Sequence, residues 1–486
     1  MNGTVATKST PNRPANFVPT TSQILVNDIH SDLNPTWVRD ITTPGNLDQL
    51  QRCIRGAANG GMSVAICGAR HAMGGQQFAS EEQLINMRNL NRVLAFDPVL
   101  GQIECEAGIQ WPKLVGYLLD NQTGQSKQWG IRQKQTGADN LTLGGAVAAN
   151  VHGRGLCMRP IVEDIESLVV IDVRGDRIRV SREETPNLFS LVVGGYGLFG
   201  VVYSVTLRLS QRQKLRRSVI IIEIDEAAER FDSAIGGGAL YGDFQFSTDE
   251  SNENFLRSGV LSCYTPVAID TPIPENQRVL SEDDWRKLVY LSHADKGQAY
   301  DLYSQHYGST DGQIYWSDTH QMSTYLEGYH TELDQRLGAT CAGSEIISEL
   351  YVPRNRLTSF MNAVRADCQQ HSTNIIYGTV RLIERDEETF LGWAREPWAC
   401  IVFNLHTDHT CAALERTADA FRRLITRATE CGGSFYLTYH RYATRDQLLK
   451  CYPQLPEFLQ QKQQLDSEER FRSDWYDHIN RTILGR

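Results

Sequence analysis

Three glycine-rich segments contain the residues best suited to hold a phosphate-bearing ligand. They span residues 68–78 (GARHAMGGQQF), 142–155 (TLGGAVAANVHGRG) and 192–202 (VVGGYGLFGVV). Glycine lets the backbone approach a ligand closely, and successive N–H groups can then form an anion-binding nest. The first two segments have this form, in Gly68 to Ala72 and in Gly144–Gly145 followed by small alanines. Two nests suit the two phosphates of a diphosphate group.

The third segment imitates a dinucleotide-binding motif. Gly195, Gly197 and Gly200 match G-x-G-x-x-G, which in a Rossmann unit leads into a helix whose N-terminus receives the pyrophosphate. Here a β-branched, alternating run, VVYSVTLRL, follows from residue 201. This run predicts a strand, which offers no helix N-terminus, so a nicotinamide-type Rossmann domain is disfavoured.

Short strands and helices are expected to position these segments. A helix is predicted from Thr43, with a cap-like Thr, Pro44 near its first turn and Gly60–Gly61 as its end. The apolar run before the first loop, SVAIC, predicts a buried strand. The other predicted elements are strands at 84–87 and 102–109, a helix opening at Pro112, a hairpin at 165–181 and a strand at 200–209.

The section from Lys214 to Cys431 differs in character, because glycine loops become sparse and aromatic residues frequent. Strands predicted at 218–224, 374–383 and 399–405 alternate with long amphipathic helices, which indicates an α+β layer. After this section the sequence predicts a strand, SFYLTYHRYAT at 434–444, and a charged helical tail at 446–486.

Composition narrows the class of protein. The formal net charge of -10 opposes binding to nucleic acid or anionic membranes. A chain of 486 residues is longer than a domain with a single hydrophobic core usually is, so two domains are expected. The 11 cysteines are scattered and never form C-x-x-C, which indicates reduced thiols. No run of about 18 apolar residues that could span a bilayer is present, and the N-terminus lacks a signal peptide, so a cytoplasmic protein is expected.

Together the glycine segments resemble the FAD-binding domain of the vanillyl-alcohol oxidase superfamily, the PCMH-type fold. ICGARHAMGGQQF is similar to the pyrophosphate loop of cytokinin dehydrogenases, and AVAANVHGRG to the G-x5-HG stretch of the sugar oxidases. The similarity covers roughly residues 36–209 and continues weakly at the C-terminus. It implies an α+β fold with a two-subdomain PCMH-type FAD-binding domain and an α+β substrate (cap) domain that contains an antiparallel sheet. The expected parts are a flexible tail at 1–31, the FAD-binding domain at 32–210, the substrate domain at 211–431 and a returning C-terminal segment at 432–486.

The resemblance also implies which residues would contact FAD. The pyrophosphate and the ring edge would meet Gly68, Ala69, Arg70, His71, Ala72 and Gln76. The second wall would comprise Thr136, Gly137, Thr142, Gly144, Gly145, Ala148, Asn150, His152 and Gly153, and the adenine side Gly195, Gly200 and Val201. For His152 a hydrogen-bonded histidine in a turn is an equal alternative.

In this superfamily the first loop often carries a histidine bonded covalently to the flavin 8α-methyl group, and His71 occupies the matching position. The alternative is a histidine that only hydrogen-bonds the cofactor. A second covalent link through cysteine is not expected, because no cysteine lies between Arg132 and Gly145.

The resemblance places substrate chemistry in the second domain and the C-terminal strand. The sugar oxidases carry a Glu-x-Arg and a lysine there. In this sequence the matching places contain Thr379 and Arg381, and then Tyr439 and His440, so the Glu and the Lys are replaced. Tyr439 and His440 are therefore the candidates for handling a proton, with Tyr439 favoured. Because neighbours on a strand point to opposite faces, only one of them can face the flavin.

Two other features of the sequence, a histidine motif and an aromatic cluster, indicate a function less strongly. His406 and His409 form an HTDH motif, but without a third ligand nearby in the sequence no metal site is expected. An aromatic cluster either packs in the core, which is favoured, or lines a substrate cleft. Its members are Tyr300, Tyr303, Tyr307, Tyr315, Trp316, Tyr325 and Tyr329.

The expected function is an FAD-dependent oxidase or dehydrogenase that takes a hydride from a CH–OH group of a small organic or sugar-like substrate to flavin N5. The electron acceptor is O2 or another molecule. The alternatives are a flavin-containing carrier or sensor without turnover, a dehydrogenase acting on a CH–NH substrate, and a nicotinamide-driven flavin reductase.

Overall fold

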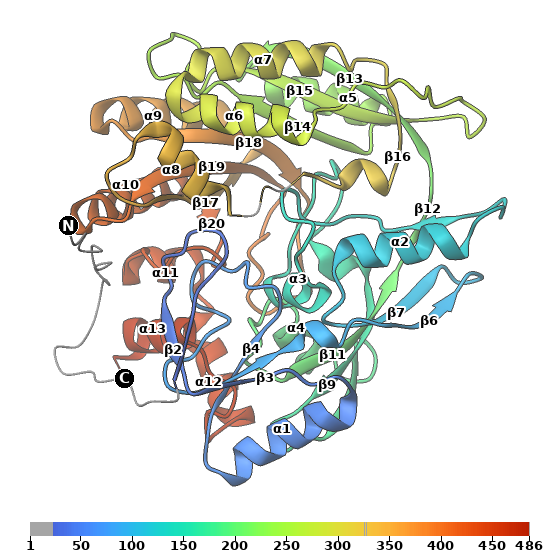
Figure 1. Ribbon diagram of the computed structural model, residues 1–486, viewed down its shortest axis with the longest axis vertical. Coiled ribbons are helices and arrows are strands. Elements are labelled where there is room, and N and C mark those ends of the chain that lie inside the picture. The colour runs from blue at the N-terminus through green and yellow to red at the C-terminus, as the bar shows by residue number, and fades with distance from the viewer. Residues whose placement is uncertain (1–22, 325, 327, 486) are drawn as a thin grey trace, which may run out of the picture.

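The computed structural model describes residues 23–324, 326 and 328–485 and shows an α+β chain. Two lobes are visible in Figure 1. The lower lobe holds the blue and cyan N-terminal elements, with the red C-terminal helices beside them, and the upper lobe holds one large sheet with its helices. No described helix has the length and apolar character needed to cross a membrane.

A small parallel sheet carries the first glycine loop. Helix α1 (Leu47–Asn59) crosses between its strands and buries Leu50, Ile54 and Ala57. The helix begins later than the sequence predicts, because Asn46, and not Thr43, caps it by accepting a hydrogen bond from Gln49 N. The sheet order is β3 (Asp40–Thr42), β5 (Gln83–Asn86) and β4 (Val64–Cys67).

A five-stranded antiparallel sheet carries the other two glycine segments. The strand predicted after the G-x-G-x-x-G motif is confirmed as β11, which lies in the middle of this sheet between β9 and β7. The order is β10 (Arg177–Ser181), β9 (Ile165–Ile171), β11 (Val201–Arg208), β7 (Gln102–Glu106) and β6 (Val93–Asp97). Its accompanying helices are α2 (Trp111–Asn121), α3 (Leu143–Ala149) and α4 (Pro186–Val192). Outside it, β8 (Trp129–Gly130) pairs with β12 (Ser210–Gln211).

The segment before residue 32 is ordered where the structure describes it. Strand β1 (Ile24–Val26) pairs with β2 (Thr36–Val38), and Asp28 is buried and accepts hydrogen bonds from Ser31. Ile29 N donates to Arg70 O of the first glycine loop. The flexible tail expected at 1–31 therefore cannot extend past residue 22, and residues 1–22 lie outside the described part of the chain.

The upper lobe is built on an eight-stranded sheet whose neighbouring strands, as far as the structure describes them, pair antiparallel. Its order is β16 (Ile314–Trp316), β13 (Lys214–Glu223), β15 (Ser258–Val267), β14 (Tyr241–Phe246), β18 (Ile375–Ile383), β19 (Trp398–Asp408), β17 (Gly343–Pro353) and β20 (Ser434–Phe435). The helices are α5 (Ala227–Gly236), α6 (Glu282–Ala294), α7 (Lys296–Gly308), α8 (Tyr329–Leu337), α9 (Leu357–His371) and α10 (Cys411–Glu430). Short 3-10 turns occupy Met87–Asn89, Ile161–Asp164, Thr319–Gln321 and Arg354–Arg356.

The C-terminal strand predicted at 434–444 is wrong beyond its first two residues. Only β20 pairs with β17, and the chain then turns away from the sheet. The reason is that the first glycine loop takes over its backbone groups: Gln76 Nε2 donates to Leu437 O, and Met73 N donates to Thr438 O.

The final helices return to the lower lobe (Figure 1). They are α11 (Arg445–Cys451), α12 (Leu455–Leu465) and α13 (Asp474–Leu484). Between the last two, Phe471 forms a parallel bridge to Val64 of β4, so this segment extends the small sheet by one position.

Candidate active site

A cavity of about 740 Å³ is lined by residues of both lobes. Cavities of this size and position, where two structural units meet, are typical of cofactor and substrate sites. One side of the cavity is formed by residues within 68–76, 136–148 and 197–201, and we call it the glycine wall. The opposite side is the sheet wall, formed by Ile347, Glu349, Tyr377, Arg381, Val402 and Asn404 of three neighbouring strands.

Two glycine loops of this wall are packed directly against each other. A Cβ on Gly68 would lie 2.1 Å from Thr142 Oγ1, and a Cβ on Gly144 would lie 2.9 Å from the Cβ of Ala107. Thr142 in turn caps α3 by accepting a hydrogen bond from Gly145 N. Only glycine at position 68 permits this approach, so the sequence dictates the contact between the loops.

Other glycines keep the wall open toward the cavity. Gly137 (φ 85°) and Gly197 (φ 76°) line it, and no atom lies within 4 Å of the place where their Cβ would stand. Arg70 also adopts the left-handed region, with φ 62°. Such strain in a non-glycine residue at a cavity wall is characteristic of binding sites. A cradle lined by backbone fits an extended diphosphate cofactor.

Most of the predicted site residues meet at this cavity. Those that line it are Gly68, Ala69, Arg70, His71, Ala72, Gln76, Thr136, Gly137, Thr142, Gly144, Gly145, Ala148, His152, Gly200, Val201, Arg381 and Tyr439. Asn150, Gly153, Gly195 and His440 are not among the lining residues.

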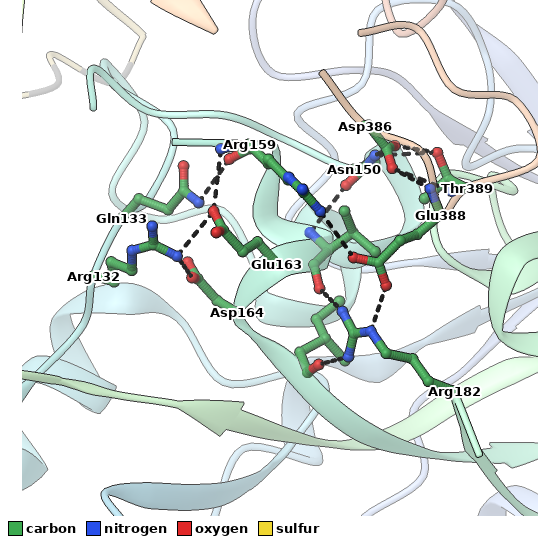
Figure 2. A network of polar contacts seen from close by, with 12 residues as sticks. Arg132, Gln133, Asn150, Arg159, Glu163, Asp164, Arg182, Asp386, Glu388 and Thr389 are labelled. Atoms are coloured by element: carbon green, nitrogen blue, oxygen red, sulfur yellow. Dashed lines mark hydrogen bonds and ion pairs between the residues drawn. The ribbon is translucent and has the colours of Figure 1, made fainter. Parts of the chain in front are cut away.

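Asn150 has a structural role instead of the expected cofactor contact. Its side chain donates to Asp386 Oδ2 (2.9 Å) and accepts from Val162 N (3.1 Å), and Figure 2 shows it inside a polar network. In the same network Arg182 contacts Glu388. These bonds fasten the end of α3 to the connection between β18 and β19, and so hold the two lobes together.

The other three residues outside the cavity also pack against protein. A Cβ on Gly153 would lie 2.7 Å from Lys134 O, and a Cβ on Gly195 would lie 1.8 Å from Leu191 O. His440 is buried, and its ring stacks on that of Tyr442 with the two ring centroids 5.2 Å apart. Glycine is therefore required at 153 and 195 for chain packing, and His440 faces away from the cavity.

His71 lies on the cavity wall in a neutral state. Its Nδ1 is 2.8 Å from Nε2 of His30, which the ordered N-terminal segment supplies. Burial, together with the neighbouring His30, lowers the pKa of His71 to about 3. An unprotonated imidazole retains a lone pair, which a nucleophile needs.

The sheet wall contains a carboxylate, that of Glu349, which is not among the site residues predicted from the sequence. Glu349 on β17 pairs with Val402 on β19, which pairs with Thr379 on β18, so all three share one row and one face. Glu349 is thus two strands away from the position where a Glu was expected, about 10 Å across the sheet. The available signal was a single acidic residue within an apolar strand run, ELYV.

Tyr439 and Glu349 form a hydrogen-bonded pair at the cavity. Tyr439 Oη donates to Glu349 Oε2 (3.1 Å), while His152 Nε2 lies 2.8 Å from Glu349 Oε1. Burial raises the pKa of Glu349, but the adjacent His152 and hydrogen bonds from His152 and Tyr351 outweigh it and lower this pKa to about 2. Burial and the same carboxylate hold the pKa of Tyr439 well above its usual range. The ionised group of the pair is therefore Glu349.

The end of the cavity within the upper lobe is aromatic and cationic. Arg217 is 8% exposed and lies 4.7–5.4 Å from the ring centroids of three tyrosines, including Tyr264 and Tyr307. Arg154 pairs with Asp243 at 3.3 Å. Arg217 Nη1 donates to Thr310 Oγ1 (3.0 Å), and its guanidinium has no carboxylate partner within the described part of the chain.

The aromatic cluster noted in the sequence contributes to this cavity. Tyr303, Tyr307, Tyr315 and Tyr329 line it, which favours the cleft interpretation for these four. Tyr325 lies outside the described residues.

Comparison with known proteins agrees with this geometry. A family model described as an FAD binding domain matches residues 40–181. The chain is 26% identical over 207 residues to the mitochondrial L-galactono-1,4-lactone dehydrogenase of Arabidopsis thaliana, which is 42% of this chain and 33% of that protein. It is 26% identical over 197 residues to cytokinin dehydrogenase 9 of Oryza sativa subsp. japonica, 40% of this chain and 35% of the relative.

A third relative is the uncharacterized oxidoreductase ORF5 in the fasciation locus of Rhodococcoides fascians, 29% identical over 170 residues, or 35% of this chain and 37% of that protein. The chain thus matches about a third of the length of these relatives. The residues matched by the family model contain the first two glycine loops, so the similarity to an FAD binding domain falls on the glycine wall.

Proposed function

We propose that the protein is an FAD-dependent oxidoreductase that dehydrogenates a CH–OH group of a small organic substrate. The observation that carries this proposal is that the glycine wall and the Tyr439–Glu349 pair face one cavity. Bound FAD would supply the acceptor for a hydride. The relatives named as lactone dehydrogenases and as a cytokinin dehydrogenase support the reaction class.

The glycine wall is proposed to hold FAD through its backbone. The loop from Gly68 to Ala72 and the turn at Gly144–Gly145 would meet the diphosphate, and Gly200 and Val201 the adenine side. The parallel sheet and the five-stranded sheet would be the two subdomains of the FAD-binding domain, each contributing one loop to this wall.

Tyr439 and Glu349 are proposed to remove the hydroxyl proton of the substrate. The Tyr439 hydroxyl would accept the substrate proton while passing its own proton to Glu349, because a buried phenolate is unfavourable and the carboxylate is ionised. His152 holds Glu349 in position from its other oxygen. This arrangement replaces the Glu and the Lys that the sequence lacks at the expected positions.

The substrate is proposed to carry an anionic group as well as the hydroxyl. Arg217 lies at the far end of the cavity without a carboxylate partner among the described residues, and Arg154 lies against the same Tyr264 ring at 4.9 Å. A carboxylate would satisfy the guanidinium with charge-assisted hydrogen bonds. Hydroxy acids are therefore the first substrates to test.

Anaerobic reduction of the bound flavin is the test of this function. Hydroxy acids, sugar acids, neutral sugars, alcohols and amines are mixed with the purified protein, and bleaching near 450 nm is followed, with dithionite as the positive control. Bleaching by a hydroxy compound is expected. Reduction by dithionite alone would indicate a carrier or sensor, reduction by amines a CH–NH dehydrogenase, and reduction by NADH or NADPH a flavin reductase. Reoxidation by O2 is then measured in the same cell.

His71 is proposed to bind the flavin covalently, supported by its place on the wall and its unprotonated ring. Acid precipitation should leave the yellow colour with the wild-type polypeptide and release it from His71→Ala. Release of FAD from the wild-type protein would overturn the covalent link without affecting the proposed reaction.

The cellular location proposed for this enzyme is the cytoplasm. Support comes from the cysteines, all 11 of which are free, as expected in a reducing compartment. Fractionation of the source cells with an antibody against the chain would test this location.

A further inference from the structure

A cluster of histidines surrounds one buried carboxylate at the edge of the cavity. Glu345 on β17 is 4% exposed, and it is contacted by His293 of α6, His330 of α8 and His406 of β19. The elements come from four separate stretches of sequence. His406 belongs to the HTDH motif, for which no third ligand was visible in the sequence.

The donor atoms have the spacing of a metal-ligand set. His293 Nε2 lies 3.2 Å and His406 Nδ1 3.3 Å from Glu345 Oε1, and the three ligand atoms are all within 4.8 Å of one another. Ligands bound tetrahedrally at about 2.1 Å from a Zn²⁺ ion would be roughly 3.4 Å apart. Two histidines and one carboxylate also form a common set for divalent transition metals.

Oxygen atoms lie near the other ring nitrogen of two histidines in this cluster, His406 and His330. His406 Nε2 lies 3.7 Å from Asp408 Oδ1, and His330 Nε2 lies 3.0 Å from the carbonyl oxygen of His30. Histidines that bind metals usually donate their other N–H to a carboxylate or a carbonyl group, which fixes the ring orientation.

Glu345 is buried, and neither lysine nor arginine pairs with it in the described part of the chain. The ion pairs of Glu345 in the described part of the chain are all with histidines, which carry no obligatory charge, and Tyr329 donates a hydrogen bond to its Oε2. A buried carboxylate without lysine or arginine is costly unless a cation accompanies it.

We propose that His293, Glu345 and His406 bind one divalent transition-metal ion of the Zn²⁺ class. The ion fastens α6 to β17 and β19. Trp285 and Val289 of α6 line the cavity, so the metal positions this part of its wall. Glu345 and Glu349 lie on the same face of β17, four residues or about 13 Å apart, so the metal is separate from the proposed proton acceptor.

Zinc binding to the intact flavoprotein, purified without a polyhistidine tag, tests the site. The protein is stripped with EDTA, equilibrated with ZnCl2, freed of excess metal by gel filtration and assayed for zinc by mass spectrometry and for thermal unfolding. We expect about one zinc per chain and a higher Tm with zinc than without it. His406→Gln should lower the zinc affinity at least tenfold and abolish the rise in Tm, with the flavin content unchanged.

His409→Gln is the matched control, because His409 belongs to the same motif but hydrogen-bonds Ser344. This variant should retain the zinc and the rise in Tm. Glu345→Gln should behave as His406→Gln does, and if it fails to fold, the wild-type stoichiometry and His406→Gln still decide. Absence of zinc from the wild-type protein, or full retention by His406→Gln, would overturn the site. A flavoprotein that bleaches with substrate but binds no zinc would leave the proposed function standing.

Discussion

The glycine wall and the sheet wall face one cavity, but their residues are supplied in different ways. In the glycine wall, Gly68 and its neighbours are consecutive in the chain, and glycine is needed because backbones approach closely. In the sheet wall, Glu349 and Arg381 come from different strands and meet through strand register, and Tyr439 of the returning C-terminal segment joins them at the cavity. The first wall is a local property of the chain, whereas the second depends on the whole upper lobe.

This difference suggests how the protein tolerates change. A glycine wall can be damaged by one added methyl group, since the loss is steric. The sheet wall exposes side chains, so single substitutions there should alter chemistry and substrate affinity while the fold and the cofactor remain. The experiments below separate the two walls in this way.

The largest effect is expected from the glycine wall. In Gly68→Ala the new Cβ would stand 2.1 Å from Thr142 Oγ1 and displace the cap of α3. The flavin-to-protein absorbance ratio should fall at least tenfold and the Tm should drop, because an N-cap alone contributes about 1 kcal/mol. Gly116→Ala is the control: it lies within α2 with no atom within 4 Å, and should add about 0.5–1 kcal/mol of stability. Full flavin content in Gly68→Ala would contradict the packed-loop account.

The sheet wall should affect the rate and not the cofactor. Glu349→Gln removes the proposed proton acceptor but keeps the shape, and the rate of flavin reduction should fall about 10²- to 10⁴-fold. Tyr439→Phe should lower the rate of flavin reduction by a similar factor, because the two groups are proposed to pass on the same proton one after the other. Stopped-flow reduction under anaerobic conditions measures both. His440→Gln, outside the cavity, should reduce the flavin at the wild-type rate, and equal losses in all three variants would contradict the assignment.

Replacing Arg217, at the other end of the sheet, should affect substrate binding and not the chemical step. In Arg217→Gln the KM for an anionic substrate should rise about 10- to 100-fold, since a charge-assisted hydrogen bond contributes about 1.5–3 kcal/mol, while kcat changes little. The probe is the hydroxy acid that reduces the flavin fastest, compared with its methyl ester. An equal rise in KM for acid and ester would show that Arg217 does not recognise the charge.

The last prediction concerns stability and pH, and it leaves the activity unchanged. Burial lowers the pKa of His440 to about 4, whereas the unfolded chain takes up this proton near pH 6.5. The unfolded state therefore binds more protons between pH 6.5 and 4, and His440 should contribute a fall in the free energy of unfolding of up to about 1.4 kcal/mol per pH unit as the solution is acidified. His440→Gln should reduce that slope, as measured by urea unfolding at several pH values. An unchanged slope would place the titrating group elsewhere.

Much of the fold could be predicted because its signals are local. The strand before the first glycine loop, the helix at Pro112, the hairpin at 165–181 and the strand after the G-x-G-x-x-G motif all follow from residue patterns within a few positions. The strand at 434–444 could not be judged in this way. Apolar and polar residues do alternate in this segment, but the backbone carbonyl group of Leu437 accepts a hydrogen bond from the first glycine loop, which lies more than 350 positions earlier.

The candidate site also contains one part that local sequence predicts and one part that it does not. The sequence by itself determined the glycine wall, because glycine spacing dictates how closely a backbone can approach a diphosphate, and its resemblance to PCMH-type domains indicated FAD. Tertiary structure alone decided that Glu349 meets Tyr439 at the cavity, that Tyr439 and not His440 lines it, and that His406 meets His293 and Glu345. These relations depend on strand register and packing between distant segments, which no local pattern of residues records.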